Sequence, residues 1–270
     1  MQVCSAACVL VQSTPGGSTA TEPSPSPVSV SVSVTCRGVV SVVTDAVVRF
    51  TTTVFVRTAG CDYRCSWCDS LYAVLPEYRD EWTLMTPSEI LARVNDLAAN
   101  QPVLISLSGG NPALQPLDSL ITLGRRKGHS FAMETQGSVA QPWFANLDWL
   151  VLSPKPPSSG MTFDWIALDA CVEAAGARSR CVLKIVVFDE ADYRFARTVA
   201  SRGPKLKIYL QVGNPAPLHA EGKAMLETAD IGDLMKRLRW LAARTIADRW
   251  FDATVLPQLH VLAWGNKRGV

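Results

Sequence analysis

The chain has 270 residues, of which 26 are Lys or Arg and 24 are Asp or Glu, so its formal net charge is only +2. This balance gives no reason to expect a nucleic-acid or membrane partner, because such surfaces require an excess of basic residues. No run of 18 or more apolar residues occurs, which excludes a membrane-spanning helix. The eight cysteines are scattered rather than dense, which indicates reduced thiols and a cytoplasmic protein.

The first 48 residues differ in composition from the rest of the chain. Residues 13–27 form a Ser/Thr/Pro/Gly tract, and residues 28–34 alternate Val with Ser. Segments of this kind bury too little apolar surface to fold, and the alternating segment has no obvious strand partner. We therefore predict a low-complexity, poorly ordered arm over residues 1–48 and one domain over residues 49–270.

From residue 49 onward, strand and helix patterns alternate. The first predicted strand covers residues 51–56, and a helix is predicted after Thr86, because Thr86, Pro87 and Glu89 suit the N-cap, N1 and N3 positions of a capping box. The further predicted strands are residues 103–107, 130–134, 149–153, 182–187 and 206–212. The further predicted helices are residues 114–127, 164–175, 191–201 and 222–247, and one more apolar stretch lies in residues 253–270.

Six strands, most with a helix between them, predict an α/β fold with parallel strands and right-handed crossovers. The polar motifs all follow strand ends, at residues 61–68, 108–112, 134–138, 153–155 and 211–215. In a parallel barrel, the carboxyl ends of the strands form the active face. We therefore predict a partial, splayed barrel of the (β/α)6 type.

The strongest functional signal is the Cys-x3-Cys-x2-Cys spacing of Cys61, Cys65 and Cys68. A closed zinc site or an ordinary cubane cluster uses four protein ligands, whereas three thiolates leave one metal position open. This pattern favours a [4Fe–4S] cluster whose open iron binds S-adenosylmethionine, which is cleaved by one electron to a 5′-deoxyadenosyl radical. The alternative is a non-enzymatic zinc module, with a fourth ligand among His129, His219, His260, Cys171 and Cys181.

A second motif, Ser108 to Pro112, follows the strand predicted at residues 103–107. Its two glycines would allow the backbone to approach a ligand closely, and its free N–H and C=O groups could bind an amino-acid ligand. Gly-Gly and Asn-Pro are also ordinary turn dipeptides. The motif therefore indicates a ligand site only in combination with the cysteines that precede it.

Together these motifs resemble those of the radical S-adenosylmethionine superfamily and, within it, the 7-carboxy-7-deazaguanine synthases. The resemblance covers residues 49–270 and is carried, in order, by residues 55–61, 65–70, 108–113, 134–138, 153–161, 256–260 and 264–270. It implies a partial (β/α)6-type radical SAM barrel that converts 6-carboxy-5,6,7,8-tetrahydropterin to 7-carboxy-7-deazaguanine with release of ammonia, for queuosine-type 7-deazapurine biosynthesis. It also implies Mg²⁺, a homodimer, and an electron donor such as flavodoxin or ferredoxin.

The resemblance assigns roles to individual residues. Cys61, Cys65 and Cys68 would hold the [4Fe–4S] cluster, and Ser70 would bind Mg²⁺ where the family usually has Thr, since either hydroxyl is a hard oxygen donor. The residues that would contact the substrate are Arg57, whose guanidinium suits a carboxylate, and Ser108. The residues that would surround S-adenosylmethionine are Gly110, Asn111, Ser153, Pro154, Lys155 and Gln211.

The chain departs from the family pattern in two places. Asn111 stands where the usual Gly-Gly-Glu-Pro motif has Glu, which keeps an acceptor oxygen but removes the charge. The family also begins with a Gln-Gly-Glu-Gly loop that touches the pterin, and no such motif precedes Arg49. A glycyl-radical activating enzyme shares the cysteine spacing and is a second alternative, although it gives no reason for the Ser-Pro-Lys-Pro-Pro motif.

Overall fold

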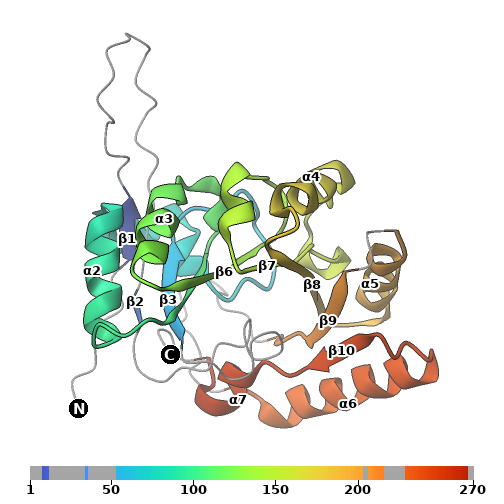
Figure 1. Ribbon diagram of the computed structural model, residues 1–270. Helices are drawn as coiled ribbons and strands as arrows, with labels where there is room; N and C mark the ends of the chain where they lie inside the picture. The colour runs from blue at the N-terminus through green and yellow to red at the C-terminus, as the bar shows by residue number, and fades with distance from the viewer. Residues whose placement is uncertain (1–7, 12–33, 36–52, 203–205, 216–228, 267–270) are drawn as a thin grey trace.

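The computed structural model describes residues 8–11, 34–35, 53–202, 206–215 and 229–266 (Figure 1). Its centre is an eight-stranded sheet with the strand order β10-β9-β8-β7-β6-β5-β3-β2. Every neighbouring pair from β3 to β10 is parallel, and only β2 pairs antiparallel. The strands are β2 (Val34–Thr35), β3 (Thr53–Thr58), β5 (Leu104–Gly109), β6 (Ser130–Thr135), β7 (Trp149–Leu152), β8 (Arg180–Val187), β9 (Lys207–Val212) and β10 (Ala253–Leu256).

The six predicted strands are confirmed, but the expected number of parallel strands was one too low. The short β10 adds a seventh, because Leu256 comes into register with Gln211 of β9. The strands β2 and β10 form the two edges of this sheet, so it is a partial barrel rather than a closed one. An α/β architecture with a parallel, incompletely closed sheet is thus confirmed.

Apart from α7, which follows β10, the helices lie in the connections between the parallel strands (Figure 1). They are α2 (Pro87–Leu97), α3 (Asp118–Arg126), α4 (Trp165–Ala175), α5 (Glu190–Arg202), α6 (Ile231–Ala247) and α7 (Leu259–Trp264). The connection from β6 to β7 contains only a short 3-10 helix, η4 (Pro142–Asn146). No helix in the described part of the chain combines the length and the apolarity that a bilayer crossing requires.

Two predicted helices have different boundaries in the structure. The helix predicted over residues 114–127 is divided into a 3-10 turn, η3 (Pro112–Leu114), and α3, which begins only at Asp118. The cause is Pro116, which lacks an N–H and holds Gln115 extended, with φ −112° and ψ 147°. The helix predicted from residue 222 begins at Ile231 in the structure, and residues 222–228 lie outside the described part.

Two segments of the predicted arm pair with the domain. Strand β1 (Cys8–Val11) pairs parallel with β4 (Trp82–Met85), and β2 pairs antiparallel with β3, so that Val34 lies opposite Val56. The expectation that the Val/Ser segment lacks a strand partner is therefore wrong at Val34. The physical reason is that β3 would otherwise present an edge with unpaired N–H and C=O groups. The remaining arm residues lie outside the described part, and the division at residue 48 stays a prediction.

The two faces of the sheet have different compositions. One face carries apolar side chains, such as Val54, Ile105 and Leu183, that pack in the main core. Since side chains alternate along a strand, the opposite face carries the residues between them. There an apolar cluster forms around Val151, Val182 and Tyr209. Nearer the carboxyl ends, the same face carries polar residues, which are Arg57, Ser108, Glu134, Lys184 and Gln211.

The capping box predicted at the start of α2 is confirmed. The Thr86 hydroxyl accepts a hydrogen bond from the Glu89 N–H at 3.3 Å, and the Glu89 carboxylate accepts one from the Thr86 N–H at 2.6 Å. The Thr86 hydroxyl also donates to Glu89 Oε2 at 2.9 Å, and the bonds donated by the Thr86 N–H and hydroxyl lower the pKa of Glu89. Both first-turn donors are satisfied, which fixes the start of α2 at Pro87.

Replacing Thr86 with Ala removes the capping acceptor, and we expect a loss of about 1 kcal/mol in the free energy of unfolding. For a chain of this size, that loss lowers Tm by about 2–4 °C in a thermal scan followed by circular dichroism. Thr198→Ala is the matched control, because Thr198 lies exposed on α5 and donates only to the Arg194 carbonyl. An equal fall of Tm in both variants would contradict the capping role.

Candidate active site

The cysteine loop follows β3 at the carboxyl edge of the sheet. Cys61, Cys65 and Cys68 are half-buried free thiols on this loop. Burial raises the pKa of all three thiols, and for Cys68 burial together with the nearby Asp69 carboxylate raises the pKa to about 12. The Lys155 ammonium acts in the opposite direction on the pKa of Cys61 and of Cys65.

The donor set of this loop fits the expected cluster. Three thiols on one loop are soft ligands, and each thiolate of a cubane cluster binds a separate iron. Among the described residues, no three His, Cys, Asp or Glu side chains are placed to share a single metal ion. Because the free thiols are protonated, metal binding releases protons.

The cysteine loop packs backbone to backbone against the turn after β5. The Gly110 N–H donates to the Thr58 carbonyl at 2.9 Å, and the Asn111 N–H donates to the Gly60 carbonyl at 2.8 Å. A Cβ on Gly110 would lie 2.0 Å from the Gly60 oxygen, and Gly109 has φ +119°. The close approach that these glycines permit is therefore to the cysteine loop itself.

Asn111 is fully buried and makes hydrogen bonds only within the protein. Its Oδ1 accepts from the Thr135 hydroxyl at 2.7 Å and from the Ala113 N–H at 3.2 Å. Its Nδ2 donates to Asp62 Oδ1 at 2.9 Å and to Ser138 Oγ at 3.1 Å. Every donor and acceptor of the side-chain amide thus has a protein partner, and the position of Asn111 beside S-adenosylmethionine stays a prediction.

A second loop, residues 156–162, holds the cysteine loop from the other side. The Ser66 N–H donates to the Ser159 carbonyl at 3.0 Å, and the Ser66 hydroxyl donates to the Ser158 carbonyl at 2.7 Å. The Tyr63 hydroxyl donates to the Thr162 carbonyl at 3.1 Å. Together these bonds fix the chain on both sides of Cys65.

Trp67, between Cys65 and Cys68, is positioned by two contacts. Its Nε1 donates to Ser158 Oγ at 3.0 Å, and its ring lies 5.3 Å from that of Phe188. Asp192 supports both partners, because one carboxylate oxygen accepts from the Ser158 N–H and the other from the Phe188 N–H, each at 3.0 Å. Asp192 is fully buried and its two oxygens are both satisfied.

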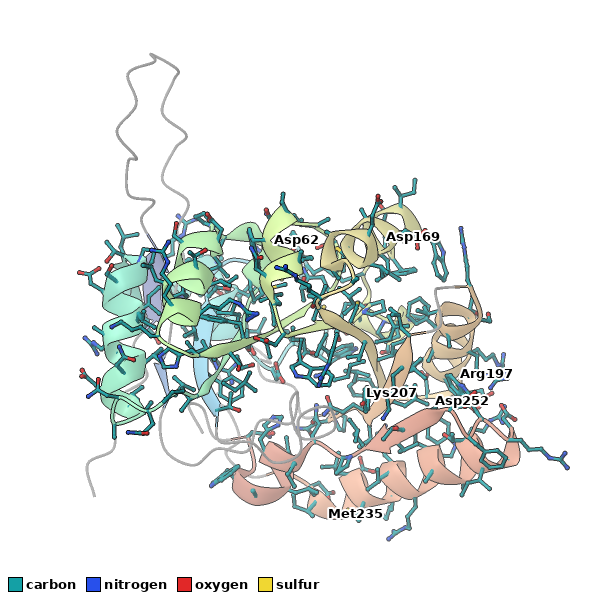
Figure 2. All side chains as sticks on the ribbon, viewed as in Figure 1. Asp62, Asp169, Arg197, Lys207, Met235 and Asp252 are labelled. Atoms are coloured by element: carbon teal, nitrogen blue, oxygen red, sulfur yellow. The ribbon has the colours of Figure 1, made fainter. Side chains whose placement is uncertain are left out.

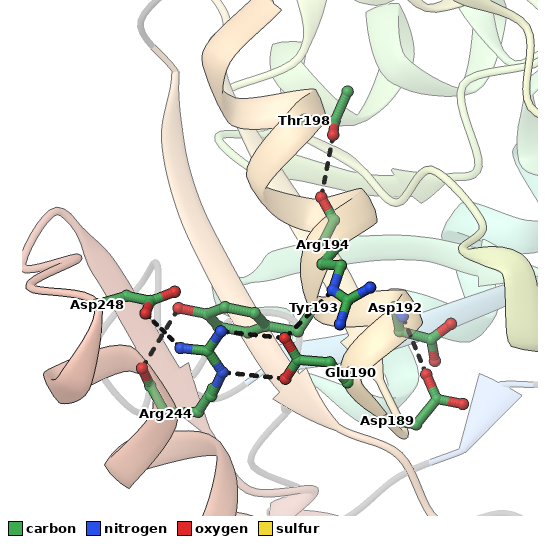
Figure 3. A network of polar contacts seen from close by, with 8 residues as sticks. All are labelled: Asp189, Glu190, Asp192, Tyr193, Arg194, Thr198, Arg244 and Asp248. Carbon is green, nitrogen blue, oxygen red and sulfur yellow. Dashed lines mark hydrogen bonds and ion pairs between the residues drawn. The ribbon is translucent and has the colours of Figure 1, made fainter.

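Asp192 belongs to α5, which is tied in turn to α6 (Figure 3). Arg244 of α6 donates to both carboxylate oxygens of Glu190, each at 3.0 Å, and also pairs with Asp248. The Arg244 guanidinium further lies over the Tyr193 ring, 4.8 Å from its centroid. The start of α5, and with it Asp192, is therefore anchored on a second helix.

Lys155 is a cation that acts on the cysteine loop from outside it. Its Nζ donates to Ser153 Oγ at 3.0 Å and lies 5.8 Å from the centroid of the Trp67 ring. Ser153 itself is held by its N–H, which donates to the Thr135 carbonyl at 2.7 Å. Ser153 and the adjoining Pro154 are buried, so this strand end is rigid beside the thiols.

The polar face of the sheet carries a group with an unused donor. Arg57 donates from Nη1 to Ser108 Oγ at 3.5 Å, but its Nε is buried without a partner. Such an orphaned donor is costly unless a ligand satisfies it. The site therefore suits an anionic ligand group beside Arg57.

An ion pair crosses this face. Lys184 Nζ lies 2.6 Å from Glu134 Oε1 and 2.8 Å from Oε2, and Lys184 is buried. The pair reaches from β8 to β6 across β7, where Val151 is the register partner of Glu134. Sequence analysis did not single out Lys184, although a lone cation in the apolar run of residues 182–187 was an available signal.

Asp69 joins this charged face to the cysteine loop. Burial alone would raise its pKa, but His260, the Ser70 hydroxyl, Arg57 and Lys184 together hold the pKa below its ordinary value. The Ser70 hydroxyl donates to Asp69 Oδ1 at 2.8 Å. A carboxylate and a hydroxyl are thus adjacent where Ser70 was expected to bind Mg²⁺, and both are hard oxygen donors.

The structure brings most of the predicted site residues to one edge of the sheet. Gln211 lies on the same face but is buried, and its amide donates to the Pro257 carbonyl at 3.3 Å. The residues that sequence analysis missed are the supporting ones, Gln136, Ser158, Asp192 and Lys184. Gln136 and Ser158 lie within motifs that were recognised, whereas Asp192 left no sequence signal.

Comparison with known proteins agrees with this geometry. The model of the radical SAM superfamily matches residues 55–150. The chain is similar to the 7-carboxy-7-deazaguanine synthases of Bacillus cereus and Bacillus subtilis, with 39% identity over 220 residues and 41% over 223 residues. Each match covers 81% of this chain and 90% of the relative.

The fold is similar to a solved structure as well. The crystal structure of QueE from Escherichia coli aligns with a TM-score of 0.53 and covers 77% of this chain and 86% of that chain. The identity is 20%, so this likeness concerns the fold alone.

The contact between Gly60 and Gly110 gives a prediction about stability. Gly110→Ala places a Cβ against the Gly60 oxygen, and we expect a loss of about 3 kcal/mol in the free energy of unfolding by urea. Gly60→Ala is the matched comparison, because its Cβ meets nothing within 4 Å and only its φ of +86° is unfavourable. Its expected loss is about 1 kcal/mol. A larger loss in Gly60→Ala than in Gly110→Ala would contradict the close approach of Gly110 to the cysteine loop.

Proposed function

Because this chain belongs to the 7-carboxy-7-deazaguanine synthase family of the radical SAM superfamily, we propose that it converts 6-carboxy-5,6,7,8-tetrahydropterin to 7-carboxy-7-deazaguanine with loss of ammonia. The chain is a radical S-adenosylmethionine enzyme, and this class uses a [4Fe–4S] cluster and S-adenosylmethionine. When bound, these groups supply a carbon-centred radical that abstracts a hydrogen atom from the substrate. The observation that carries the proposal is the placement of three free thiols beside the charged face of the sheet.

The cluster ligands are Cys61, Cys65 and Cys68. The loop that carries these cysteines is fixed by the turn after β5 on one side and by residues 156–162 on the other. S-adenosylmethionine would lie beside the loop. The residues that would surround it are Gly110, Asn111, Ser153, Pro154, Lys155 and Gln211. Lys155 contributes positive charge beside the thiolates.

The substrate lies against the polar face of the sheet. Arg57 binds the pterin carboxylate through its unused Nε and its Nη groups, since guanidinium and carboxylate form paired, charge-assisted hydrogen bonds. Ser108 accepts from Arg57 Nη1 and so orients the guanidinium. The Glu134–Lys184 pair keeps a second charged group fixed on the same face.

Ser70 would hold Mg²⁺ through its hydroxyl, and the bound ion would orient oxygens of the substrate. The neighbouring Asp69 supports this role because its lowered pKa keeps it ionised at neutral pH. Mg²⁺ sites commonly use only one or two carboxylates together with substrate oxygens. A pair of hard donors is therefore sufficient on the protein side.

The protein functions as a cytoplasmic homodimer that accepts its electron from flavodoxin or ferredoxin. Its relatives support the need for an external reductant, since radical SAM enzymes act by one-electron reduction of the cluster. The free state of the described cysteines supports a reducing compartment. Residues 49–270 form the radical SAM domain, which is consistent with relatives that match 81% of the chain.

The direct test uses the full chain reconstituted with iron and sulfide under anaerobic conditions. We expect brown protein that forms 7-carboxy-7-deazaguanine from carboxytetrahydropterin, as detected by mass spectrometry, and no product from Cys65→Ser. Cys181→Ser is the matched control, because Cys181 lies on β8 outside the cysteine loop. A protein that contains zinc but no iron would support the non-enzymatic zinc module instead. Iron with no deazaguanine product would favour a different substrate, as in a glycyl-radical activating enzyme.

The role of Arg57 can be tested separately. Arg57→Lys keeps the charge but loses the forked geometry, and we expect KM for the pterin to rise by about tenfold to a hundredfold. The iron content of the reconstituted variant should match that of the wild type, because Arg57 does not touch the thiols. Arg93→Lys, on the exposed face of α2, is the control. An unchanged KM in Arg57→Lys would remove Arg57 from the substrate site.

A further inference from the structure

Asp62, which directly follows Cys61, is held by two side-chain amides. Its Oδ1 accepts from Asn111 Nδ2 at 2.9 Å and from Gln136 Nε2 at 2.5 Å. Asn111 lies in the turn after β5, and Gln136 follows β6, so one carboxylate oxygen joins three strand ends. Asp62 is labelled in Figure 2 above the sheet.

The orientation of the Asn111 amide follows from its surroundings. The Ala113 backbone N–H can only donate, so the Asn111 atom that faces it must be the oxygen. The nitrogen therefore faces Asp62 and Ser138. This arrangement requires a donor at position 111, which an amide supplies and an ionised carboxylate does not.

The same network reaches a cluster ligand. Gln136 Nε2 lies 3.7 Å from Cys61 Sγ as well as 2.5 Å from Asp62. Hydrogen bonds and charge beside the ligating sulfurs are among the factors that set the potential of an iron–sulfur cluster. A change of charge at position 62 or 111 should therefore alter both the position of the cysteine loop and the reduction potential of the cluster.

We propose that Asp62 and Asn111 are a coupled pair of positioning residues that fixes the Cys61 end of the cysteine loop. This chain carries Asn111 where the superfamily's usual motif has Glu, because a carboxylate at position 111 would face the carboxylate of Asp62. The effect on the cluster rests on the proposed ligation by Cys61. The pairing itself does not, since it is present in the protein without metal.

Four variants test the pair, namely Asn111→Asp, Asp62→Asn, the double variant, and Asn146→Asp as an exposed control on η4. In the metal-free protein, Asn111→Asp should lower Tm by about 4–8 °C, because a buried donor becomes an acceptor that faces a like charge. Adding Asp62→Asn reverses the roles of donor and acceptor. It should recover at least half of that fall, because the Gln136 amide can flip to present its oxygen to the new donor at position 62. If Asn111→Asp alone gives no soluble protein, a soluble double variant would support the pairing in the same way.

The reduction potential of the reconstituted cluster separates this role from simple stabilisation. Added negative charge favours the oxidised cluster, so Asn111→Asp should shift the potential to a more negative value and Asp62→Asn to a less negative one. The double variant has the wild-type charge and should return toward the wild-type potential, while Asn146→Asp should not change it.

The outcomes are decisive in both directions. A double variant that is no more stable than Asn111→Asp would overturn the pairing, and potentials that do not follow the charge would overturn its action on the cluster. A wild-type chain that binds no iron would instead refute the proposed function. In that case the Tm series on metal-free protein would still decide the pairing.

Discussion

The site depends on the backbone contact between the cysteine loop and the turn after β5. Gly110 and Asn111 donate to the carbonyls of Thr58 and Gly60, and no Cβ fits between the two segments. Hydrogen bonds of this kind are short-range and directional, so they hold the start of the cysteine loop against the turn after β5. The three cysteines, Arg57 and the polar sheet face are all positioned relative to this contact.

Around that contact the protein builds a rigid frame from groups that do not take part in the chemistry. Asp192 satisfies two backbone N–H groups, and through Ser158 and Phe188 it holds Trp67 between two cysteines. The helix that carries Asp192 is joined to α6 by Arg244 (Figure 3). A buried carboxylate is stable only when its oxygens are paired, so these bonds support both the fold and the site.

The charges near the thiols have different structural roles. Lys184 and Glu134 neutralise each other within the sheet, whereas Arg57 keeps a buried donor without a partner. Asp62 is bound by amides, and Asp69 is surrounded by cations and the Ser70 hydroxyl. The unpaired Arg57 donor on the polar face is where we propose that a ligand binds, while the satisfied groups form the frame.

The sequence by itself determined the parallel α/β order, the start of α2 and the edge of the sheet at which the site lies. These features depend on local patterns, namely alternation of apolar residues, a capping box, and cysteines and glycines placed directly after strands. Only the tertiary structure decided that Asn111 binds Asp62, that Asp192 supports Trp67, that Lys184 pairs with Glu134, and that β10 joins the sheet. Each of these depends on strand register or on contacts between residues far apart in the chain, for which local spacing holds no information. Asn111 shows the difference: its position at a strand end was readable from the sequence, but its partner came from a loop 49 residues away.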